Sequence, residues 1–335
     1  MSHANISVFI PHSGCPNQCS FCNQKKITGT VHQPSPAQVG EILKVAAENH
    51  KHRPQDTEIA FFGGSFTAID RKYMVALLDV AQKYLQDGSF CGIRVSTRPD
   101  CISAEILNLL KAKGVTSIEL GAQSMDNDVL QANLRGHTRE DVTTASKLIR
   151  DFGISLGLQM MTGLYKSTKE KDRRTAELLA ALGPDTMRIY PTVVMKDTLL
   201  QELYASGEYV PYSFEETVEL CADLLEFFAE KSIPVIRLGL QDSTSLKNGS
   251  VAGVWHPAFR EICENRIFFK KFLDISRKQK IYTGKVCVYV HPKATSKMIG
   301  QKRENLKKLA ALGYDLRVKP DESLGKFEIR MENCR

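Results

Sequence analysis

The 335-residue sequence lacks long hydrophobic runs: it has no stretch of about 18 uncharged apolar residues, which argues against a membrane-spanning segment. Residues 1–11 carry neither a basic flank nor a small-residue cleavage site, so they do not resemble a secretory signal peptide. Internal repeats and low-complexity tracts are also missing. With 42% hydrophobic and 25% charged residues, the composition excludes intrinsic disorder and collagen-like or coiled-coil designs. We therefore expect a cytoplasmic globular protein of one large or two smaller domains.

The cysteines do not follow a disulfide pattern. There are nine, an odd number, at the unevenly spaced positions 15, 19, 22, 91, 101, 221, 263, 287 and 334. Because thiols stay reduced in the cytoplasm, we expect them to have roles other than disulfide formation. Cys334, one residue from the end, is interpreted as a thiol in a terminal tail.

Charge is unevenly distributed along the chain. The net charge is +7, but residues 266–335 carry +11 and residues 1–265 carry −4. A basic segment beside an acidic body favours a polyanionic partner such as a nucleic acid. A solvated basic surface without any partner explains the same charge equally well.

Short β-branched runs alternate with longer amphipathic stretches. Strands are predicted at residues 6–10, 58–62, 92–96, 117–120, 155–161, 186–190 and 234–238. Helices are predicted at residues 36–50, 71–86, 104–113, 139–152, 169–182 and 213–231. This alternation predicts an α/β fold, namely a partial or complete TIM-like (βα)6-7 barrel, with a doubly wound sheet as the alternative. In both folds the functional residues lie at the carboxyl ends of the strands.

The alternation stops near residue 240, which predicts three parts. Residues 1–240 form the barrel. Residues 241–284 form a connecting segment, with a polar loop at 241–253 and a helix at 257–275. Residues 285–335 form a small basic α+β domain, with strands at 285–291, 314–319 and 326–331 and helices at 295–299 and 304–312.

The motif C-x3-C-x2-C, formed by Cys15, Cys19 and Cys22, directly follows the first predicted strand. Pro16 and its polar neighbours predict a loop, which can fold three thiolates around one inorganic centre. Iron–sulfur cubanes usually have four cysteine ligands, so three leave one iron open, as a reactive site requires. A Cys3His zinc site that includes His12 is the main alternative, and inert buried cysteines are another.

This motif, with Phe21 before its last cysteine and the βα pattern behind it, resembles the radical S-adenosylmethionine (SAM) enzymes. The resemblance implies that Cys15, Cys19 and Cys22 bind a [4Fe–4S] cluster whose open iron is chelated by SAM. It also implies that one electron cleaves SAM to methionine and a 5′-deoxyadenosyl radical, which takes a hydrogen atom from the substrate. An electron donor such as flavodoxin or ferredoxin is implied as a partner.

Further motifs narrow the resemblance to the branch with the Elongator catalytic subunit and oxygen-independent coproporphyrinogen oxidase. They lie at 61–67, 119–124, 134–138, 159–164 and 188–212. The resemblance implies SAM contacts from Gly63, Gly64, Ser65, Gln123, Arg135 and Gln159, and Ser96 adds a hydroxyl that can hydrogen-bond a ribose. Tyr190 and His256 are candidate catalytic residues, although both residue types serve equally in packing.

Residues 300–303, Gly-Gln-Lys-Arg, lie between two predicted helices and resemble the loop of a minimal KH module. Arg303 replaces the second glycine of that loop. Five cations are expected to neutralise RNA phosphates, namely Lys297, Lys302, Arg303, Lys307 and Lys308. A lid with a basic face is the alternative interpretation.

The leading hypothesis is a radical SAM enzyme that modifies a base in tRNA or rRNA. One alternative is radical SAM chemistry on a small molecule such as a tetrapyrrole. Another is a non-catalytic, metal-containing RNA-binding protein.

Overall fold

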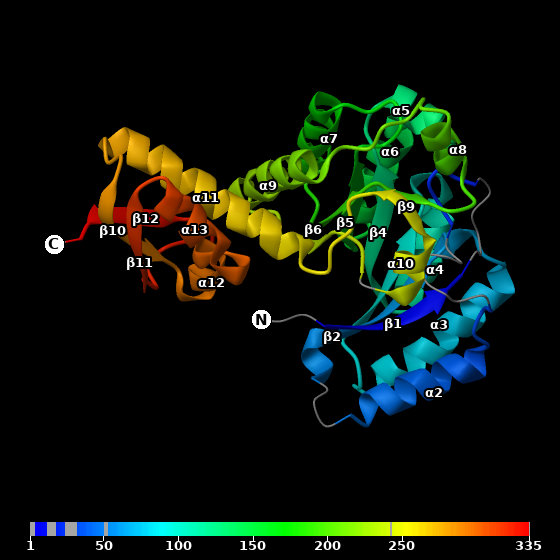
Figure 1. Cartoon of the computed structure of the whole chain (residues 1–335). Helices are drawn as coiled ribbons and strands as arrows, with labels where there is room; N and C mark the ends of the chain where they lie inside the picture. The colour runs from blue at the N-terminus through cyan, green and yellow to red at the C-terminus, as the bar shows by residue number, and fades with distance from the viewer. Residues whose placement is uncertain (1–3, 12–17, 24–31, 50–52, 242, 335) are drawn as a thin grey trace. The chain divides into compact units, whose positions relative to one another are not determined.

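The computed structural model describes residues 4–11, 18–23, 32–49, 53–241 and 243–334 (Figure 1). The chain forms two compact units. Unit 1 comprises Met1–Tyr212, Ile233–Arg237 and Gln241–Val254, and unit 2 comprises Ser213–Ser232, Leu238–Leu240 and Trp255–Arg335. Residues 213–232 thus group with the C-terminal part of the chain, and the predicted domain limits at 240 and 284 stay predictions.

A seven-stranded sheet in the order β1-β2-β3-β4-β5-β6-β8 organises unit 1. Every strand pair from β1 to β6 is parallel. Because the strands follow chain order and β1 and β8 are the edges, the sheet is an open (βα) barrel, which confirms the TIM-like prediction. A doubly wound sheet would reverse its strand order at a switch point, so that alternative is wrong. The strands are β1 (Ala4–Ile10), β2 (Thr57–Gly63), β3 (Gly92–Thr97), β4 (Val115–Gln123), β5 (Ser155–Thr162), β6 (Thr186–Pro191) and β8 (Val235–Leu238).

Amphipathic helices connect these strands and begin at polar capping residues. Ser35 and Thr138 each form a reciprocal capping box, which satisfies backbone N–H groups that the first turn leaves free. Each helix buries one apolar stripe, as Met74, Leu77 and Leu78 do in α3. The helices are α2 (Pro36–Ala47), α3 (Arg71–Gln86), α4 (Ala104–Ala112), α5 (Asn127–Ala132), α6 (Arg139–Asp151), α7 (Lys169–Ala181) and α8 (Leu199–Ala205).

The loop predicted at residues 241–253 is wrong from residue 244 onward. This segment contains α10 (Thr244–Gly249), capped by Ser243, and β9 (Ser250–Gly253). β9 pairs with β7 (Val193–Met195) in an antiparallel ribbon. Because that pairing joins segments more than fifty residues apart, the local pattern of polar residues carries no sign of it.

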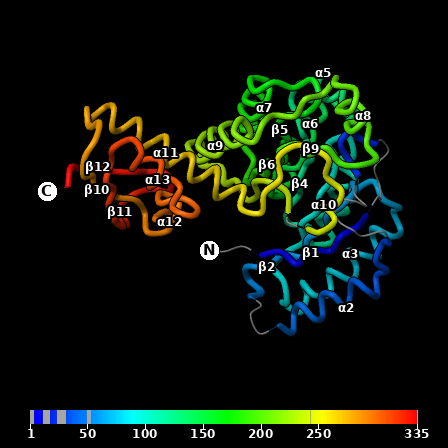
Figure 2. The backbone as a smooth tube through the Cα atoms, in the orientation of Figure 1, coloured from blue at the N-terminus to red at the C-terminus, as the bar shows by residue number. Residues whose placement is uncertain are grey.

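Unit 2 contains two long helices and a small sheet. The helices α9 (Phe214–Glu230) and α11 (Phe259–Gln279) are joined by ion pairs such as Arg266–Glu219 at 2.9 Å and Lys270–Asp223 at 2.7 Å. Figure 2 traces the chain onward through β10 (Gly284–Val290), α12 (Thr295–Ile299), α13 (Glu304–Ala311), β11 (Tyr314–Pro320) and β12 (Ile329–Asn333). No helix within the described ranges is long and apolar enough to cross a membrane.

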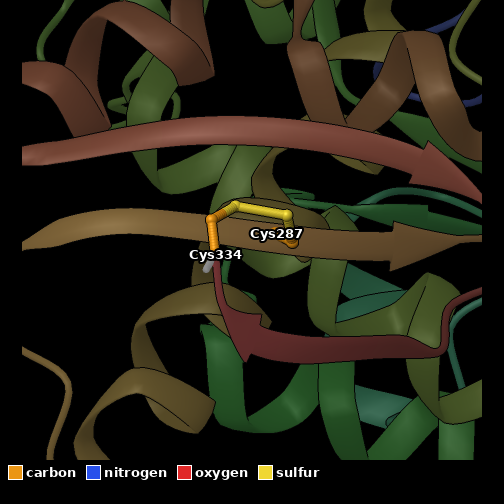
Figure 3. The surroundings of a disulfide bond; sticks show 2 residues. All are labelled: Cys287 and Cys334. Carbon is orange, nitrogen blue, oxygen red and sulfur yellow. A yellow bond between two sulfur atoms is a disulfide. The ribbon is translucent and has the colours of Figure 1, made fainter.

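Cys287 and Cys334 form a disulfide (Figure 3). Cys287 lies in β10, and the Cys334 N–H donates to the Lys285 carbonyl at 3.0 Å, which continues the β10–β12 ladder. The interpretation of Cys334 as a tail thiol is therefore wrong. The ladder brings the two cysteines together although 47 residues separate them in sequence.

One face of the large sheet buries charge. Arg94 Nε lies 2.7 Å from Glu58 Oε2, and Arg94 Nη1 lies 3.1 Å from Glu119 Oε1. The Arg188 guanidinium lies 2.7 Å from Glu119 and 5.0 Å from the centre of the Phe62 ring. Because buried ions are stable only when paired, the four side chains depend on one another.

We expect Arg94→Ala to destabilise the protein by about 3–5 kcal/mol, since it leaves Glu58 without its buried cation. Urea unfolding at neutral pH measures this free energy. Arg71→Ala is the matched control, because Arg71 and Glu105 form an exposed pair at 2.8 Å, and we expect it to cost less than about 1 kcal/mol. Equal losses in the two variants would show that the network does not stabilise the sheet.

Candidate functional site

The predicted site residues of unit 1 gather at one edge of the sheet. Parallel strands place their carboxyl ends side by side, and the residues lie at or just after those ends. They are Cys19 and Cys22 after β1, Gly63, Gly64 and Ser65 at β2, Ser96 in β3, Gln123 in β4, Arg135 after α5, Gln159 in β5 and Tyr190 in β6.

Several of these side chains share one face of the sheet. Ser96 is in register with Glu119, and Gln159 is in register with both Gly121 and Arg188. Since residues in register on parallel strands project to the same side, Ser96 and Gln159 lie on the face that carries the buried charges. The Tyr190 hydroxyl, two residues beyond Arg188, accepts from Arg188 Nη1 at 3.4 Å.

The cysteine motif is only partly placed, because Cys15 lies outside the described residues. Cys19 is 8% exposed, and the Cys22 N–H donates to its carbonyl at 3.1 Å. Within the described part of the chain, no group of three Cys, His, Asp or Glu side chains lies close enough to hold a metal ion. A three-thiolate centre therefore requires Cys15.

The loop that carries Cys19 and Cys22 is fixed by its neighbours. Ser20 binds the buried Asn133 twice, through Oγ to Oδ1 at 2.8 Å and through its N–H to the Asn133 carbonyl at 3.1 Å. The Leu200 N–H donates to the Ser20 carbonyl at 2.8 Å. Phe21 packs against a cluster that includes Leu200 and Tyr209. These contacts hold both cysteines on the same rigid support.

Arg135 joins this loop to the sheet. Its Nη1 lies 3.0 Å from Cys19 Sγ and its Nη2 donates to the Gly121 carbonyl at 2.7 Å. The side chain is 6% exposed, and its Nε has no hydrogen-bond partner among the described residues. A second guanidinium, that of Arg98, donates to the Arg135 carbonyl and to both oxygens of Asp100. Its Nη1 likewise finds no partner within the described ranges.

Gly63 allows the ends of β1 and β2 to approach closely. Its φ is +126°, and a Cβ there would come 2.3 Å from the Ile10 carbonyl oxygen. The Gly64 N–H donates to that same oxygen at 3.0 Å. The Ser65 hydroxyl bonds Thr97 Oγ1 at 2.8 Å and accepts the Arg98 N–H at 3.2 Å, so it supports the fold. The role of Ser65 in binding SAM stays a prediction.

Gln123 has a strained backbone. Its φ is +66°, at a register shift between β4 and β5, where an L-residue is disfavoured by roughly 1–2 kcal/mol. The Gln123 Oε1 accepts from Gln159 Nε2 at 3.2 Å. Strain of this kind persists only where the surroundings hold it, and it is common in functional sites.

A buried carboxylate holds the turn after β5. Asp172 is 3% exposed and accepts hydrogen bonds from the Gly163 N–H at 2.8 Å, Ser167 Oγ at 2.6 Å and the Tyr212 hydroxyl at 3.3 Å. The Tyr209 hydroxyl donates to the Gly163 carbonyl at 2.6 Å. Burial outweighs these hydrogen bonds and raises the pKa of Asp172 to about 6.

His137 is neutral near pH 7. Its Nε2 lies 3.2 Å from the Ala122 carbonyl, so this nitrogen carries the proton. Burial and the positive charge of Arg135 lower the pKa of His137 to about 4. The contact with Ala122 holds the turn that carries Arg135 against the end of β4.

The remaining predicted residues, namely His256 and the five cations of residues 297–308, belong to unit 2. His256 Nδ1 accepts the Ala258 N–H at 3.0 Å at the start of α11, which is a structural contact. Lys297 pairs with the buried Glu264 at 2.6 Å, and Lys308 pairs with Glu304 at 2.6 Å. Within the described ranges, Lys302, Arg303 and Lys307 form no ion pair, and the first two have left-handed φ values of 52° and 62°.

One pocket of about 390 Å³ lies over α5 and the start of α7. None of the predicted site residues lines it. Its lining residues are Asp128, Gln131, Ala132, Lys166 and Lys171.

Sequence reasoning missed the residues that support the site. The charged network had a usable signal in the sequence, since Glu58, Arg94 and Glu119 each place one charge beside apolar residues within a predicted strand. Asn133 and Asp172 had none, because a buried Asn or Asp looks like an ordinary cap or turn residue in sequence.

The sequence profile of the Radical SAM superfamily matches residues 9–179, and that of the Radical_SAM C-terminal domain matches residues 184–268. The first match spans more than half of the chain, so the protein belongs to the radical SAM superfamily. This is a family of enzymes that use a [4Fe–4S] cluster and SAM.

Among curated proteins, the chain is 30% identical over 204 residues to the tRNA uridine(34) acetyltransferase of Methanocaldococcus jannaschii, which covers 55% of this chain and 37% of that protein. It is 29% identical over 254 residues to the same-named protein of Dehalococcoides mccartyi, covering 65% of this chain and 55% of that protein. It is 30% identical over 194 residues to human Elongator complex protein 3, covering 52% and 36%. The chain thus spans only part of each relative.

Two solved structures support the fold. The archaeal Methanocaldococcus infernus Elp3 with an N-terminal deletion has a TM-score of 0.61 at 23% identity, covering 83% of this chain and 63% of that chain. The coproporphyrinogen III oxidase HemN of Escherichia coli has a TM-score of 0.50 at 15% identity, covering 83% and 79%. At these identities the likeness concerns the fold alone.

The pKa values of Asp172 and His137 predict opposing effects of pH on stability. Asp172 ionises at about 6 in the fold against 3.8 unfolded, so its contribution is lost as pH rises from about 4 to 6. His137 takes a proton at about 4 in the fold against 6.5 unfolded, so its contribution is lost as pH falls through the same range. Each amounts to at most about 3 kcal/mol.

We therefore expect Asp172→Asn to make stability rise more steeply with pH than wild type between about pH 4 and 6.5, and His137→Gln to do the reverse. Urea unfolding across this range measures both slopes. Asp151→Asn, at an exposed position, is the control. Parallel curves for the two variants would refute the assigned pKa directions.

Proposed function

We propose that the protein binds a [4Fe–4S] cluster through Cys15, Cys19 and Cys22, cleaves SAM reductively and modifies a base in RNA. The observation that carries this proposal is the buried contact between Arg135 and Cys19 Sγ at the carboxyl edge of the sheet. The guanidinium places positive charge beside a sulfur that would bind the cluster.

The residues present fit a cluster. Cys19 and Cys22 belong to one anchored turn, and Cys15 precedes them by the spacing of the motif. Two cations, Arg135 and Arg98, lie beside this turn and offset the negative charge of thiolates and sulfides. Asn133 would hold the turn in place from behind, in the supporting role that buried partners of metal ligands usually have.

The edge of the sheet also fits SAM. Arg135 Nε and Arg98 Nη1 are buried donors without partners in the described part of the chain, and a carboxylate is the natural acceptor for a guanidinium. As the resemblance implies, Gly63 and Gly64 at the end of β2 would contact the amino group of SAM. Ser96, Gln123 and Gln159 offer hydroxyl and amide groups on the same face of the sheet.

When bound, the cluster and SAM supply a one-electron cleavage that yields a radical able to abstract hydrogen. The chain's own residues bind and orient the reactants and keep water away from them. Tyr190 would contact the substrate at the end of β6, where Arg188 fixes its hydroxyl. His256 stays a candidate residue for contacting the substrate. Flavodoxin or ferredoxin is the proposed electron donor, and the cytoplasm is the proposed location of the protein.

RNA is proposed as the substrate because relatives at 29–30% identity are named for tRNA uridine(34). The basic character of residues 266–335 supports this choice. Lys302, Arg303 and Lys307 lie together at the start of α13, where they would contact phosphates. Acetyl transfer is named for those relatives and is not part of this proposal.

The first test is anaerobic reconstitution with iron and sulfide, followed by SAM and dithionite. We expect a cluster and 5′-deoxyadenosine, both lost in Cys19→Ala and stimulated by bulk cellular RNA in wild type. Cys91→Ala, an exposed cysteine away from the motif, should behave as wild type. Bound zinc without sulfide would overturn the proposal, and product formation indifferent to RNA would shift the substrate to a small molecule.

A second test concerns Arg135. We expect Arg135→Gln to lower the reduction potential of the cluster in the absence of SAM, because a nearby cation favours the more negative reduced state. A redox titration followed by electron paramagnetic resonance measures the potential. Arg139→Gln, an exposed arginine, is the control. An unchanged potential in Arg135→Gln would show that the guanidinium does not lie beside the cluster.

A further inference from the structure

The three-stranded sheet of unit 2 has two chemically different faces. β10 is the central strand, parallel to β11 and antiparallel to β12, and its register defines which side chains share a face. One face is apolar and packs toward α11, α12 and α13. It carries Val286, Val288 and Val290 of β10, Leu316 and Val318 of β11, and Met331 of β12.

The opposite face is polar and centred on Tyr289. In register with Tyr289 are Lys319 on β11 and Arg330 on β12. The Arg330 guanidinium carbon lies 4.0 Å and Lys319 Nζ 5.6 Å from the centre of the Tyr289 ring. Both distances are within the range of cation–π attraction, so the ring contacts one cation from each neighbouring strand.

More charge surrounds this ring. One step along the same face, Cys287 is in register with Arg317 and Glu332, and a further step pairs Lys285 with Asp315. Lys285, Arg317 and Lys319 are exposed, and Arg330 is 46% exposed. Four cations thus oppose two carboxylates in the registered rows, and a third carboxylate, Asp321, pairs with Arg330. This excess of positive charge favours a polyanion.

Arg330 is held over the ring by acidic neighbours. Its Nη2 lies 3.0 Å from Asp321 Oδ2, and its Nη1 pairs with Glu332. Figure 3 shows the disulfide between Cys287 and Cys334. By register Cys287 belongs to the same face as Tyr289, and the Cys334 N–H donates to the Lys285 carbonyl at 3.0 Å, which fixes the last residues of the sheet. The face is therefore built from restrained side chains.

We propose that this face, defined by Lys285, Tyr289, Arg317, Lys319 and Arg330, binds single-stranded RNA. Bases stack on the Tyr289 ring and the Arg330 guanidinium, and Lys285, Arg317 and Lys319 neutralise phosphates. Unpaired bases stack on aromatic rings and guanidinium planes, whereas duplex RNA keeps its bases inside. The inference rests on the proposed function and assigns part of its substrate binding to a surface other than the loop at 300–303.

The test measures binding by the full chain to a fluorescent single-stranded oligouridine of about twelve nucleotides, by anisotropy at several salt concentrations. We expect Tyr289→Ala to weaken binding about tenfold and Tyr289→Phe to bind within about threefold of wild type, since phenylalanine keeps the stacking ring. Lys319→Gln should reduce the slope of log affinity against log salt by about 0.7, the value for one phosphate of a single strand.

Matched controls separate stacking from lost stability. Tyr282→Ala removes a tyrosine that is 64% exposed and precedes β10, and we expect it to bind as wild type. Tyr289→Leu keeps an apolar side chain without an aromatic ring, so it should fold and still bind about tenfold more weakly. Urea unfolding of each variant checks the fold directly.

The outcomes distinguish this surface from the proposed function. Equal affinity of wild type and Tyr289→Ala for the oligonucleotide would overturn the proposed surface and leave RNA as a substrate. Wild type that binds no RNA would overturn the RNA part of both proposals, while cluster assembly and SAM cleavage would still be measurable. Equal affinity for a duplex of the same length would exclude base stacking.

Discussion

The guanidinium of Arg135 is the contact on which the arrangement of the candidate site depends. It bonds Cys19 Sγ, from the loop after β1, and the Gly121 carbonyl, from the end of β4. A guanidinium presents five donors in one plane, so it can serve a sulfur and a carbonyl at once. The neighbouring Asn133 ties the same loop to the same turn, so backbone and side chain act together.

Beneath this edge, the sheet separates two kinds of surface. Glu58, Arg94, Glu119 and Arg188 cancel one another's charge on one face, and apolar side chains such as Ile118 and Leu120 occupy the other. The paired charges cost desolvation, but they give the strands a hydrogen-bonding interior that apolar side chains could not provide. A polar ligand at the strand ends therefore contacts polar side chains of this face and not an exposed apolar surface.

Much of the fold could be predicted because the local spacing of apolar residues determines its strands and helices. All seven strands of the large sheet and the six long helices from α2 to α9 follow from alternating or helical spacing, with differences of one to three residues at most ends. The β7–β9 ribbon and α10 could not be predicted, because they depend on pairing between distant segments. The same limit applies to the disulfide, whose cysteines give no spacing signal.

The cysteine motif and the glycine pair could be found from sequence because their spacing is local. Their supports could not, since Ser20 and Asn133 are 113 residues apart and the left-handed φ of Gln123 has no mark in the sequence. The basic residues show a related limit. Lys297 and Lys308 look like their neighbours in sequence, yet the structure engages each with a carboxylate.

The division of unit 2 along the chain has a consequence during synthesis. α9 buries eight residues, and its ion-pairing partner α11 begins only at Phe259, after β9 and after β8, the last strand of the large sheet. At about 5–20 residues per second, α9 leaves the ribosome several seconds before α11 is complete. During that interval the apolar stripe of α9 lacks the helix that packs against it in the folded protein.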